Sequence, residues 1–174
     1  MHRRIVQCLM AITVLCAPAL AGELDAFVPP QDGATVCWSR LYDAAHLTQH
    51  PEQKVSQMGL ALTYHGPAND LGEYYQFRLE AQLRDGMRGF ATGPCEARNG
   101  KMWCGVECDG GGVAVGLRNG GAVLLDLTET GYIRLAESCD AEEADGFELM
   151  AGRDDRTFLL GGASAKECKA MIRR

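Results

Sequence analysis

The sequence predicts a mainly β protein: an antiparallel up-and-down meander that forms a barrel or rolled sheet of about eight strands, with a short N-terminal helix and a C-terminal helix. Two observations support this. Four turn-forming dipeptides occur at spacings of 14, 10 and 10 residues, and alternating apolar residues run between them. Asn, Asp and Gly tolerate the positive φ of tight hairpin turns, so these dipeptides mark the strand ends. They are Asp85-Gly86, Asn99-Gly100, Asp109-Gly110 and Asn119-Gly120.

The length of 174 residues suits one domain and is short for two. An apolar fraction of 47% is too high for a disordered chain, and no apolar run after the first 21 residues is long enough to span a bilayer. We therefore expect a signal peptide over residues 1–21 and a single disulfide-stabilised β domain over 22–174. Within that domain we expect an N-terminal arm and helix (22–54), a β meander (55–161) and a C-terminal helix (162–174).

The first residues have the pattern of a secretory signal peptide. A positive start precedes an apolar stretch too short for a membrane helix, and Ala19-Leu20-Ala21 supplies the small residues that precede a cleavage site between Ala21 and Gly22. Cleavage would leave 153 residues with a net charge of −8 and six cysteines. An even number of cysteines in an exported chain predicts disulfide bonds and a periplasmic or secreted location. The acidic charge excludes a nucleic-acid partner, and no cofactor is expected.

One disulfide follows from the register of a hairpin. With Asn99-Gly100 as a two-residue loop, Cys95 faces Cys104 on a non-hydrogen-bonded pair, where the Cα atoms of two strands approach most closely. The pairing of the other four cysteines stays open, although Cys37 or Cys108 is favoured for joining the N-terminal segment or the C-terminal helix to the sheet. Those four are Cys37, Cys108, Cys139 and Cys168.

The same counting sets the registers of the neighbouring hairpins. A two-residue turn at Asp109-Gly110 places Cys104 opposite Val115, and one at Asn119-Gly120 places Val115 opposite Leu124. A turn at Asp85-Gly86 places Phe90 opposite Ala81, which is out of phase with an inward Cys95. A bulge at Gly93-Pro94 would restore the phase.

The remaining elements follow from alternation and from helix signals. Before the first turn we expect an extended arm over Gly22 to Ala34 and a helix over Ser39 to His50, which Pro51 ends. A C-terminal helix over Ser164 to Arg174 has Ser164 as N-cap and Glu167 three residues later. The expected further strands are Val55 to His65, Glu73 to Arg84, Gly121 to Thr128, Tyr132 to Glu137, Phe147 to Ala151 and Arg156 to Leu160.

Two groups of residues are candidate sites. Apolar side chains on the inward face of the strands would either line a ligand-binding lumen or fill a closed core. They are Tyr64, Tyr75, Phe77, Leu79 and Phe90. On the expected N-terminal helix, His46 and His50 share one face with Asp43, a combination that can hold zinc or copper. The alternative is a surface helix that happens to carry two histidines.

Two stretches resemble a group of uncharacterised exported proteobacterial proteins. They are the segment from Cys37 to Leu47, continuing to Gln53, and the segment from Val106 to Gly112. The resemblance implies export and disulfides, and it implies no activity. The order of elements is also similar to that of lipocalins, but the Gly-x-Trp signature of their first strand is missing.

The sequence favours a binding protein over an enzyme, because no serine stands in a nucleophile-elbow pattern and catalytic groups are few. The leading hypothesis is a periplasmic, non-enzymatic protein that binds a small apolar or amphipathic ligand in a β-barrel. The first alternative is an envelope protein–protein module or enzyme inhibitor that uses its acidic surface and an exposed Trp103. The second is a metal-binding protein built on Asp43, His46 and His50.

Overall fold

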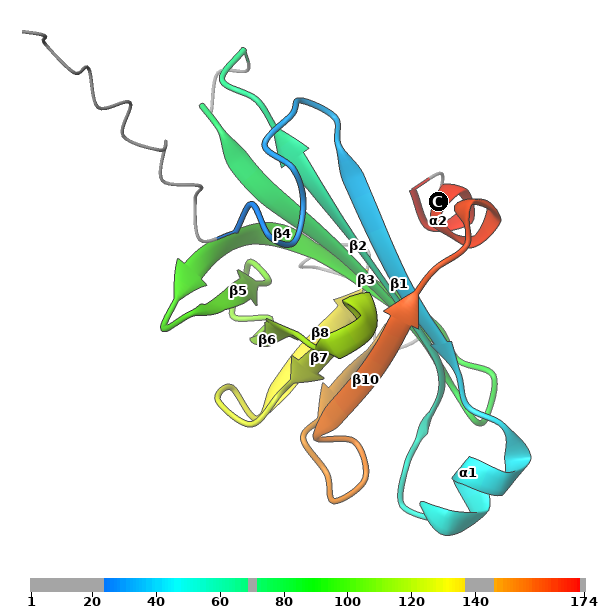
Figure 1. The fold of residues 1–174 in the computed structure, drawn as a ribbon. Coiled ribbons are helices and arrows are strands. Elements are labelled where there is room, and N and C mark those ends of the chain that lie inside the picture. The colour runs from blue at the N-terminus through cyan, green and yellow to red at the C-terminus, as the bar shows by residue number, and fades with distance from the viewer. Residues whose placement is uncertain (1–23, 69–71, 137–145, 173–174) are drawn as a thin grey trace, which may run out of the picture.

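The computed structural model describes residues 24–68, 72–136 and 146–172. Eight antiparallel strands form a closed barrel in the order β1-β10-β7-β6-β5-β4-β3-β2, which confirms the predicted fold class (Figure 1). The barrel strands are β1 (Thr35–Leu41), β2 (Val55–His65), β3 (Tyr74–Leu83), β4 (Arg88–Arg98), β5 (Lys101–Gly105), β6 (Gly112–Leu117), β7 (Val123–Asp126) and β10 (Thr157–Gly162). The expected signal peptide, Met1 to Ala21, and Cys139 lie outside the described residues.

Outside the barrel wall lie a second sheet and two helices. Strands β8 (Tyr132–Ala136) and β9 (Gly146–Met150) form a two-stranded sheet. The helices are α1 (Ala44–Gln49) and α2 (Ala165–Ile172), and a 3₁₀ turn, η1 (Asn119–Gly121), joins β6 to β7.

The N-terminal part differs from the expectation. Strand β1 occupies residues that were expected to be arm and helix, and α1 begins only at Ala44. The helix starts there because the Asp43 side chain caps it, accepting a hydrogen bond from the His46 N–H at 2.8 Å. The segment before β1 is not an extended arm either, because the Phe27 N–H donates to the Leu24 carbonyl at 2.9 Å and turns the chain back.

The Asn99-Gly100 hairpin has the predicted register, with Cys95 opposite Cys104 and a disulfide between them. The next turn is shifted by one residue. Its central residues are Cys108 and Asp109, with φ of 57° and 55°, and the Gly110 N–H donates to the Glu107 carbonyl. Cys104 therefore pairs with Val113 instead of Val115, a shift of two residues that leaves the same side chains facing inward.

Two other turns have three residues where two were expected. The loop Asn119–Gly121 places Val115 opposite Leu125, so Leu124 is not the inward residue. The loop between Leu83 and Met87 places Ala81 opposite Gly89.

The longer loop at Asp85-Gly86 also changes the direction of Phe90. Phe90 pairs with Glu80 on the outer face, and the β3–β4 register runs without interruption from Tyr75 to Gln82. The bulge expected at Gly93-Pro94 is therefore wrong, because the three-residue loop already brings Cys95 into phase. Proline is tolerated at position 94 because the β4–β5 ladder begins only at Cys95.

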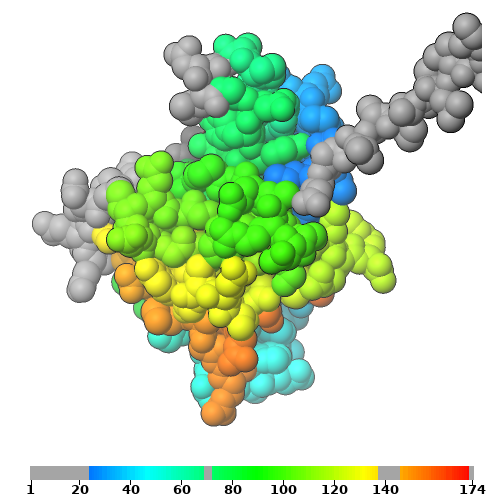
Figure 2. Space-filling view, turned by 90° about the vertical axis from the view of Figure 1, so that its left-hand side faces the viewer, coloured from blue at the N-terminus to red at the C-terminus, as the bar shows by residue number. Residues whose placement is uncertain are grey.

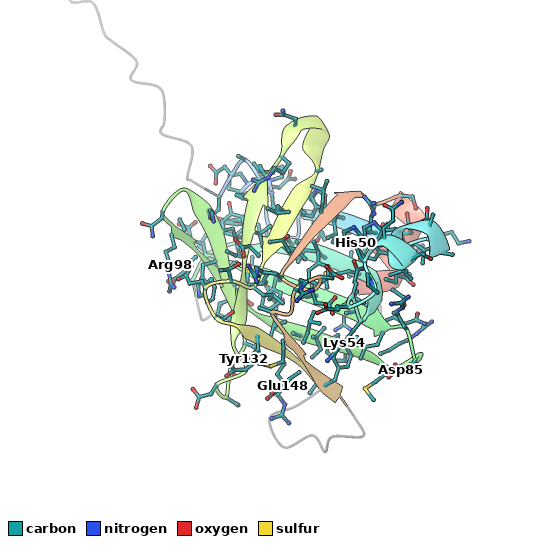
Figure 3. All side chains as sticks on the ribbon, turned by 90° about the horizontal axis from the view of Figure 1, so that it is seen from below. His50, Lys54, Asp85, Arg98, Tyr132 and Glu148 are labelled. Atoms are coloured by element: carbon teal, nitrogen blue, oxygen red, sulfur yellow. A yellow bond between two sulfur atoms is a disulfide. The ribbon has the colours of Figure 1, made fainter. Side chains whose placement is uncertain are left out.

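Side chains fill the interior of the barrel. The largest of them, on five of the eight barrel strands, are almost fully buried: Met58, Leu60, Leu62, Phe77, Leu79, Met102, Leu125 and Phe158. In the view from below, the polar residues His50, Lys54 and Asp85 lie on the same side of the molecule, on the right (Figure 3). The barrel is thus held together by a continuous apolar core.

Both ends of the barrel are covered. At the end where β1 and β3 begin, Leu24, Phe27 and Val28 of the N-terminal segment join the core. At the opposite end, the β8–β9 sheet contributes Ile133 and Leu135, which are fully buried. Figure 2 shows the β4–β6 face as a closed surface with the N-terminal segment (blue) lying against it.

A candidate binding cleft beside helix α2

Helix α2 is fixed on the outside of the barrel by its N-terminal cap. The Ser164 N–H donates to Glu167 Oε2 at 2.9 Å, and the Glu167 N–H donates to Ser164 Oγ at 3.3 Å, which is the capping box that the sequence predicts. The Ser39 hydroxyl of β1 donates to Glu167 Oε1 at 3.1 Å. Hydrogen bonds from Ser164 and Ser39 lower the pKa of Glu167, because they stabilise its carboxylate form.

A disulfide and an apolar contact hold the rest of the helix against β1 and β2. Cys37 of β1 is bonded to Cys168 of α2, so Cys37 is the cysteine that joins the C-terminal helix to the sheet. Met171 is buried against Gly59, and a Cβ on that glycine would lie 2.6 Å from Met171 Sδ. The absence of a side chain at Gly59 thus lets the helix lie close to the strand.

Between α2 and the outer face of β2–β4 lies a cleft of about 490 Å³. Its apolar walls are Met171 on the helix and Phe90 on β4, and Gly59 forms part of its floor. Polar side chains from three adjacent strands lie at one end of it: Gln57, Gln82 and Arg88. An apolar body with polar groups at one end is the usual arrangement of a small-molecule site.

Within the described residues, one of the two guanidinium groups that line the cleft has a carboxylate partner and the other has none. Arg78 Nε lies 3.0 Å from Glu80 Oε1, and the Arg78 guanidinium also lies 3.8 Å from the centroid of the Phe90 ring. Among the residues that the structure describes, no carboxylate lies within ion-pair distance of Arg88. Arg88 is therefore the group that can receive an anion in this cleft.

Because Glu167 caps α2, the stability of the protein is expected to depend on the protonation of this carboxyl group. Because the folded pKa of Glu167 is lowered, its contribution is complete above its ordinary value of 4.5 and is lost as the pH falls through the lowered value. We expect Glu167→Gln to be less stable than wild type at neutral pH and the difference to shrink in acid. Urea unfolding at a series of pH values measures this, with Glu107→Gln in an exposed turn as control. A difference that stays constant with pH would contradict the capping role.

Four of the five residues proposed to line a lumen lie inside the barrel, and the fifth does not. Phe77 and Leu79 are almost fully buried, and Tyr64 and Tyr75 lie in the same core cluster. This placement fits the closed-core alternative. Phe90 lies on the outer face, where it forms a wall of the cleft.

The two tyrosines connect the core with the N-terminal segment. The Tyr75 hydroxyl donates to Asp25 at 2.8 Å, and the Tyr64 hydroxyl donates to Glu73 at 2.8 Å. Burial, followed by the hydrogen bond to Asp25, raises the pKa of Tyr75. Both hydroxyls therefore act as structural donors at the covered end of the barrel.

The three residues proposed for a metal site are near one another but do not converge. Asp43 caps α1, the rings of His46 and His50 stack with centroids 4.4 Å apart, and His46 Nε2 lies 3.0 Å from Gln53 Oε1. His50 Nδ1 lies 3.7 Å from Asp154 Oδ1. Across the described ranges, no group of three or more His, Cys, Asp or Glu residues has an arrangement that could hold a metal ion.

Trp103, proposed as an exposed interaction residue, is half-buried. The Arg98 guanidinium lies 4.8 Å from the centroid of its ring, and Arg98 is itself paired with Glu96 and Glu129. The indole is thus partly covered by an ion-paired side chain.

No helix in the described part of the chain is long and apolar enough to cross a membrane. Comparisons of the chain with protein-family models, with curated proteins and with solved structures find no match. The fold defines a disulfide-containing, closed eight-stranded β-barrel, and its own geometry is the basis for the function proposed below.

The sequence pattern did not reveal the cleft. Its polar residues Gln57, Gln82 and Arg88 are ordinary outward-facing positions of three strands, and they become a site only because α2 lies beside them. The one local signal was Cys168. A disulfide from this cysteine to the sheet would hold the C-terminal helix against the barrel, as its bond to Cys37 does.

Proposed function

We propose that this protein is an exported, non-enzymatic binding protein of the periplasm that takes a small amphipathic ligand in the cleft beside α2. The observation that carries the proposal is the Arg88 guanidinium, which has no ion-pair partner in the described part of the chain and lies at one end of a cleft whose walls are Phe90 and Met171. An anionic head would bind Arg88, with the amides of Gln57 and Gln82 as further hydrogen-bond partners. An apolar or aromatic body would lie between the two walls.

The interior of the barrel is a weaker candidate for the same ligand. The side chains expected to line it are packed against one another, and an occupant would have to displace Phe77 or Leu79 from the core. The cleft needs no such rearrangement.

The groups around the cleft support binding over catalysis. The Glu80 carboxylate is paired with Arg78, and the Glu167 carboxylate accepts hydrogen bonds from Ser164 and Ser39. Both carboxylates thus stabilise the walls. The remaining polar groups of the cleft, two amides and a guanidinium, can orient a ligand but are poor acids and bases at neutral pH.

The test uses anilinonaphthalene sulfonate, a fluorescent probe with an aromatic body and an anionic head. We expect it to bind wild-type protein, and we expect Arg88→Gln to weaken binding by about tenfold, because a hydrogen bond to a charged group contributes about 1.5–3 kcal/mol. The control Arg153→Gln removes a guanidinium that is 79% exposed and paired with Glu52, away from the cleft, and should leave the affinity unchanged.

Amide chemical-shift mapping locates the bound probe. Shifts should appear at Gly59, Gly89 and Ala170, which line the cleft. Shifts confined to interior residues such as Leu62 and Val115, together with equal affinity of wild type and Arg88→Gln, would place the ligand in the barrel and overturn the cleft proposal.

A further inference from the structure

The barrel is closed by an unusually short ladder between β1 and β10. These strands pair only at Trp38 with Gly162 and at Ser39 with Gly161, and the Ala163 N–H donates to the Cys37 carbonyl just beyond. Strand β1 continues to Leu41 and pairs there with β2 alone. Strand β10 pairs with β7 alone from Thr157 to Leu160.

Two hydrogen bonds show which way the backbone groups of β10 point. Ala163 donates to β1, whereas the Arg156 carbonyl accepts from Leu127, on the β7 side. Because successive residues of a strand direct their backbone groups to opposite sides, the odd-numbered residues Thr157 and Leu159 direct theirs toward β1. By the same alternation from Cys37, Leu41 of β1 directs its N–H and C=O toward β10. The described ladder provides no partner for these groups.

The stretch over which β1 and β10 do not pair with each other, Arg40–Leu41 and Thr157–Leu160, is called the seam here. The side chains on its outer face are exposed and apolar. If the register continued, Leu41 would lie opposite Leu159, and these leucines are 74% and 46% exposed. Arg40, the next residue toward the short ladder, is also exposed, and its guanidinium carbon lies 5.3 Å from the centroid of the Tyr42 ring. Behind them, Phe158 and Leu160 belong to the buried core.

The seam is bounded at its other end by hydrogen bonds between loops. Asp155 accepts from the Lys54 N–H at 2.7 Å, and His50 lies 3.7 Å from Asp154. Burial raises the pKa of Asp155, although the backbone donors oppose this. In Figure 1, the ribbons of β1 and β10 meet near α2 and separate toward α1. The seam is therefore a short stretch of two free strand edges. The β1–β10 ladder closes it at one end, and the contacts of Asp154 and Asp155 close it at the other.

We propose that this seam, the segments Arg40–Leu41 and Thr157–Leu160, is a docking site for an extended peptide segment of a partner protein. The peptide adds as a strand to the free edge of β10, where Thr157 and Leu159 offer their backbone N–H and C=O groups, and contacts Leu41. This inference does not rest on the small-molecule cleft, which is lined mainly by β2, β3, β4 and α2, although Ser39 of β1 also lines it.

The chemistry of the seam specifies the peptide. Its backbone must be extended, because the free groups are those of a strand edge, and its outward side chains must be apolar to cover Leu41 and Leu159. It carries an acidic residue for Arg40, which has no ion-pair partner among the described residues. A second copy of this barrel fits poorly, because the free edges are two and four residues long and are flanked by intact wall.

The test selects peptides from a phage-displayed library of random linear twelve-residue sequences. Selected peptides should alternate apolar residues and contain Asp or Glu, and a synthetic copy of the best should bind wild type in calorimetry. Hydrogen exchange of the Thr157 and Leu159 amides should slow by at least tenfold in the complex, because these amides become donors to the peptide.

Variants distinguish the seam from other surfaces. Leu41→Lys with Leu159→Lys should weaken peptide binding at least tenfold, and Arg40→Gln should weaken it while leaving peptides without acidic residues unaffected. The control Leu117→Lys changes another leucine that is 39% exposed and should have no effect. Arg88→Gln should also have no effect on the peptide, so failure of the cleft proposal and failure of this one are separable.

Two results would overturn the inference. The first is a selection whose best peptides bind wild type and the double lysine variant equally well. The second is a complex in which the Thr157 and Leu159 amides exchange as fast as in the free protein.

Discussion

Replacing Cys37 and Cys168 by serine is expected to lower the free energy of unfolding by about 3–5 kcal/mol, because the bond joins residues 131 positions apart. Closing a loop of that length removes more entropy from the unfolded chain than closing a short one. The substitution also frees α2, whose Met171 covers Gly59, so binding of anilinonaphthalene sulfonate in the cleft should weaken. Urea unfolding and the probe titration measure the two effects on one sample.

The second disulfide is the matched control. Cys95 and Cys104 are only nine positions apart and belong to a hairpin whose turn already determines its register. Replacing this pair by serine should cost about 2–3 kcal/mol by the same loop-entropy argument and should leave the cleft intact. Unchanged probe binding in the Cys37 and Cys168 variant, or loss of probe binding in the hairpin variant alone, would show that the Cys37–Cys168 bond does not hold the helix that walls the cleft.

Replacing Phe77 by alanine is expected to lower the free energy of unfolding by about 3–5 kcal/mol. Its ring is fully buried in the barrel, and its removal leaves a cavity that the surrounding strands cannot close. Urea unfolding monitored by circular dichroism measures the loss.

Phe90→Ala is the natural comparison, because Phe90 lies on the neighbouring strand and points outward. It is half-buried under the Arg78 guanidinium, and its loss should cost about 1 kcal/mol. If Phe77 instead lined a ligand-filled lumen, its substitution would change ligand affinity at little cost in stability. Equal, small losses for the two phenylalanines would therefore argue against a packed core.

Local sequence signals predicted local structure well. The Asn99-Gly100 turn placed Cys95 opposite Cys104 because both central residues tolerate positive φ, and the pairing then follows by counting. The capping box of α2 was predictable for a similar reason, since Ser164 and Glu167 satisfy each other's backbone donors within one turn. Long alternating strands such as β2 and β3 were also predicted within about one residue of their ends.

Predictions failed where one residue more or less in a loop decides the outcome. A two-residue and a three-residue turn at Asp85-Gly86 are both compatible with the sequence, but they send Phe90 to opposite faces of the sheet. Strand β1 was missed because residues 39–50 have a helical composition, and pairing with the whole edge of β2 outweighs that propensity over residues 39–41.

By itself, then, the sequence determined the fold class, most strand positions, one disulfide and the cap of the last helix. All of these depend on contacts between residues close together in the chain. Only the tertiary structure decided that Cys37 pairs with Cys168, that Arg88 faces a cleft beside α2, and that β1 and β10 meet over two residue pairs. Each of these depends on how segments about eighty or more positions apart come together when the barrel closes. That closure depends on the summed lengths of every strand and loop between them, which no local pattern records.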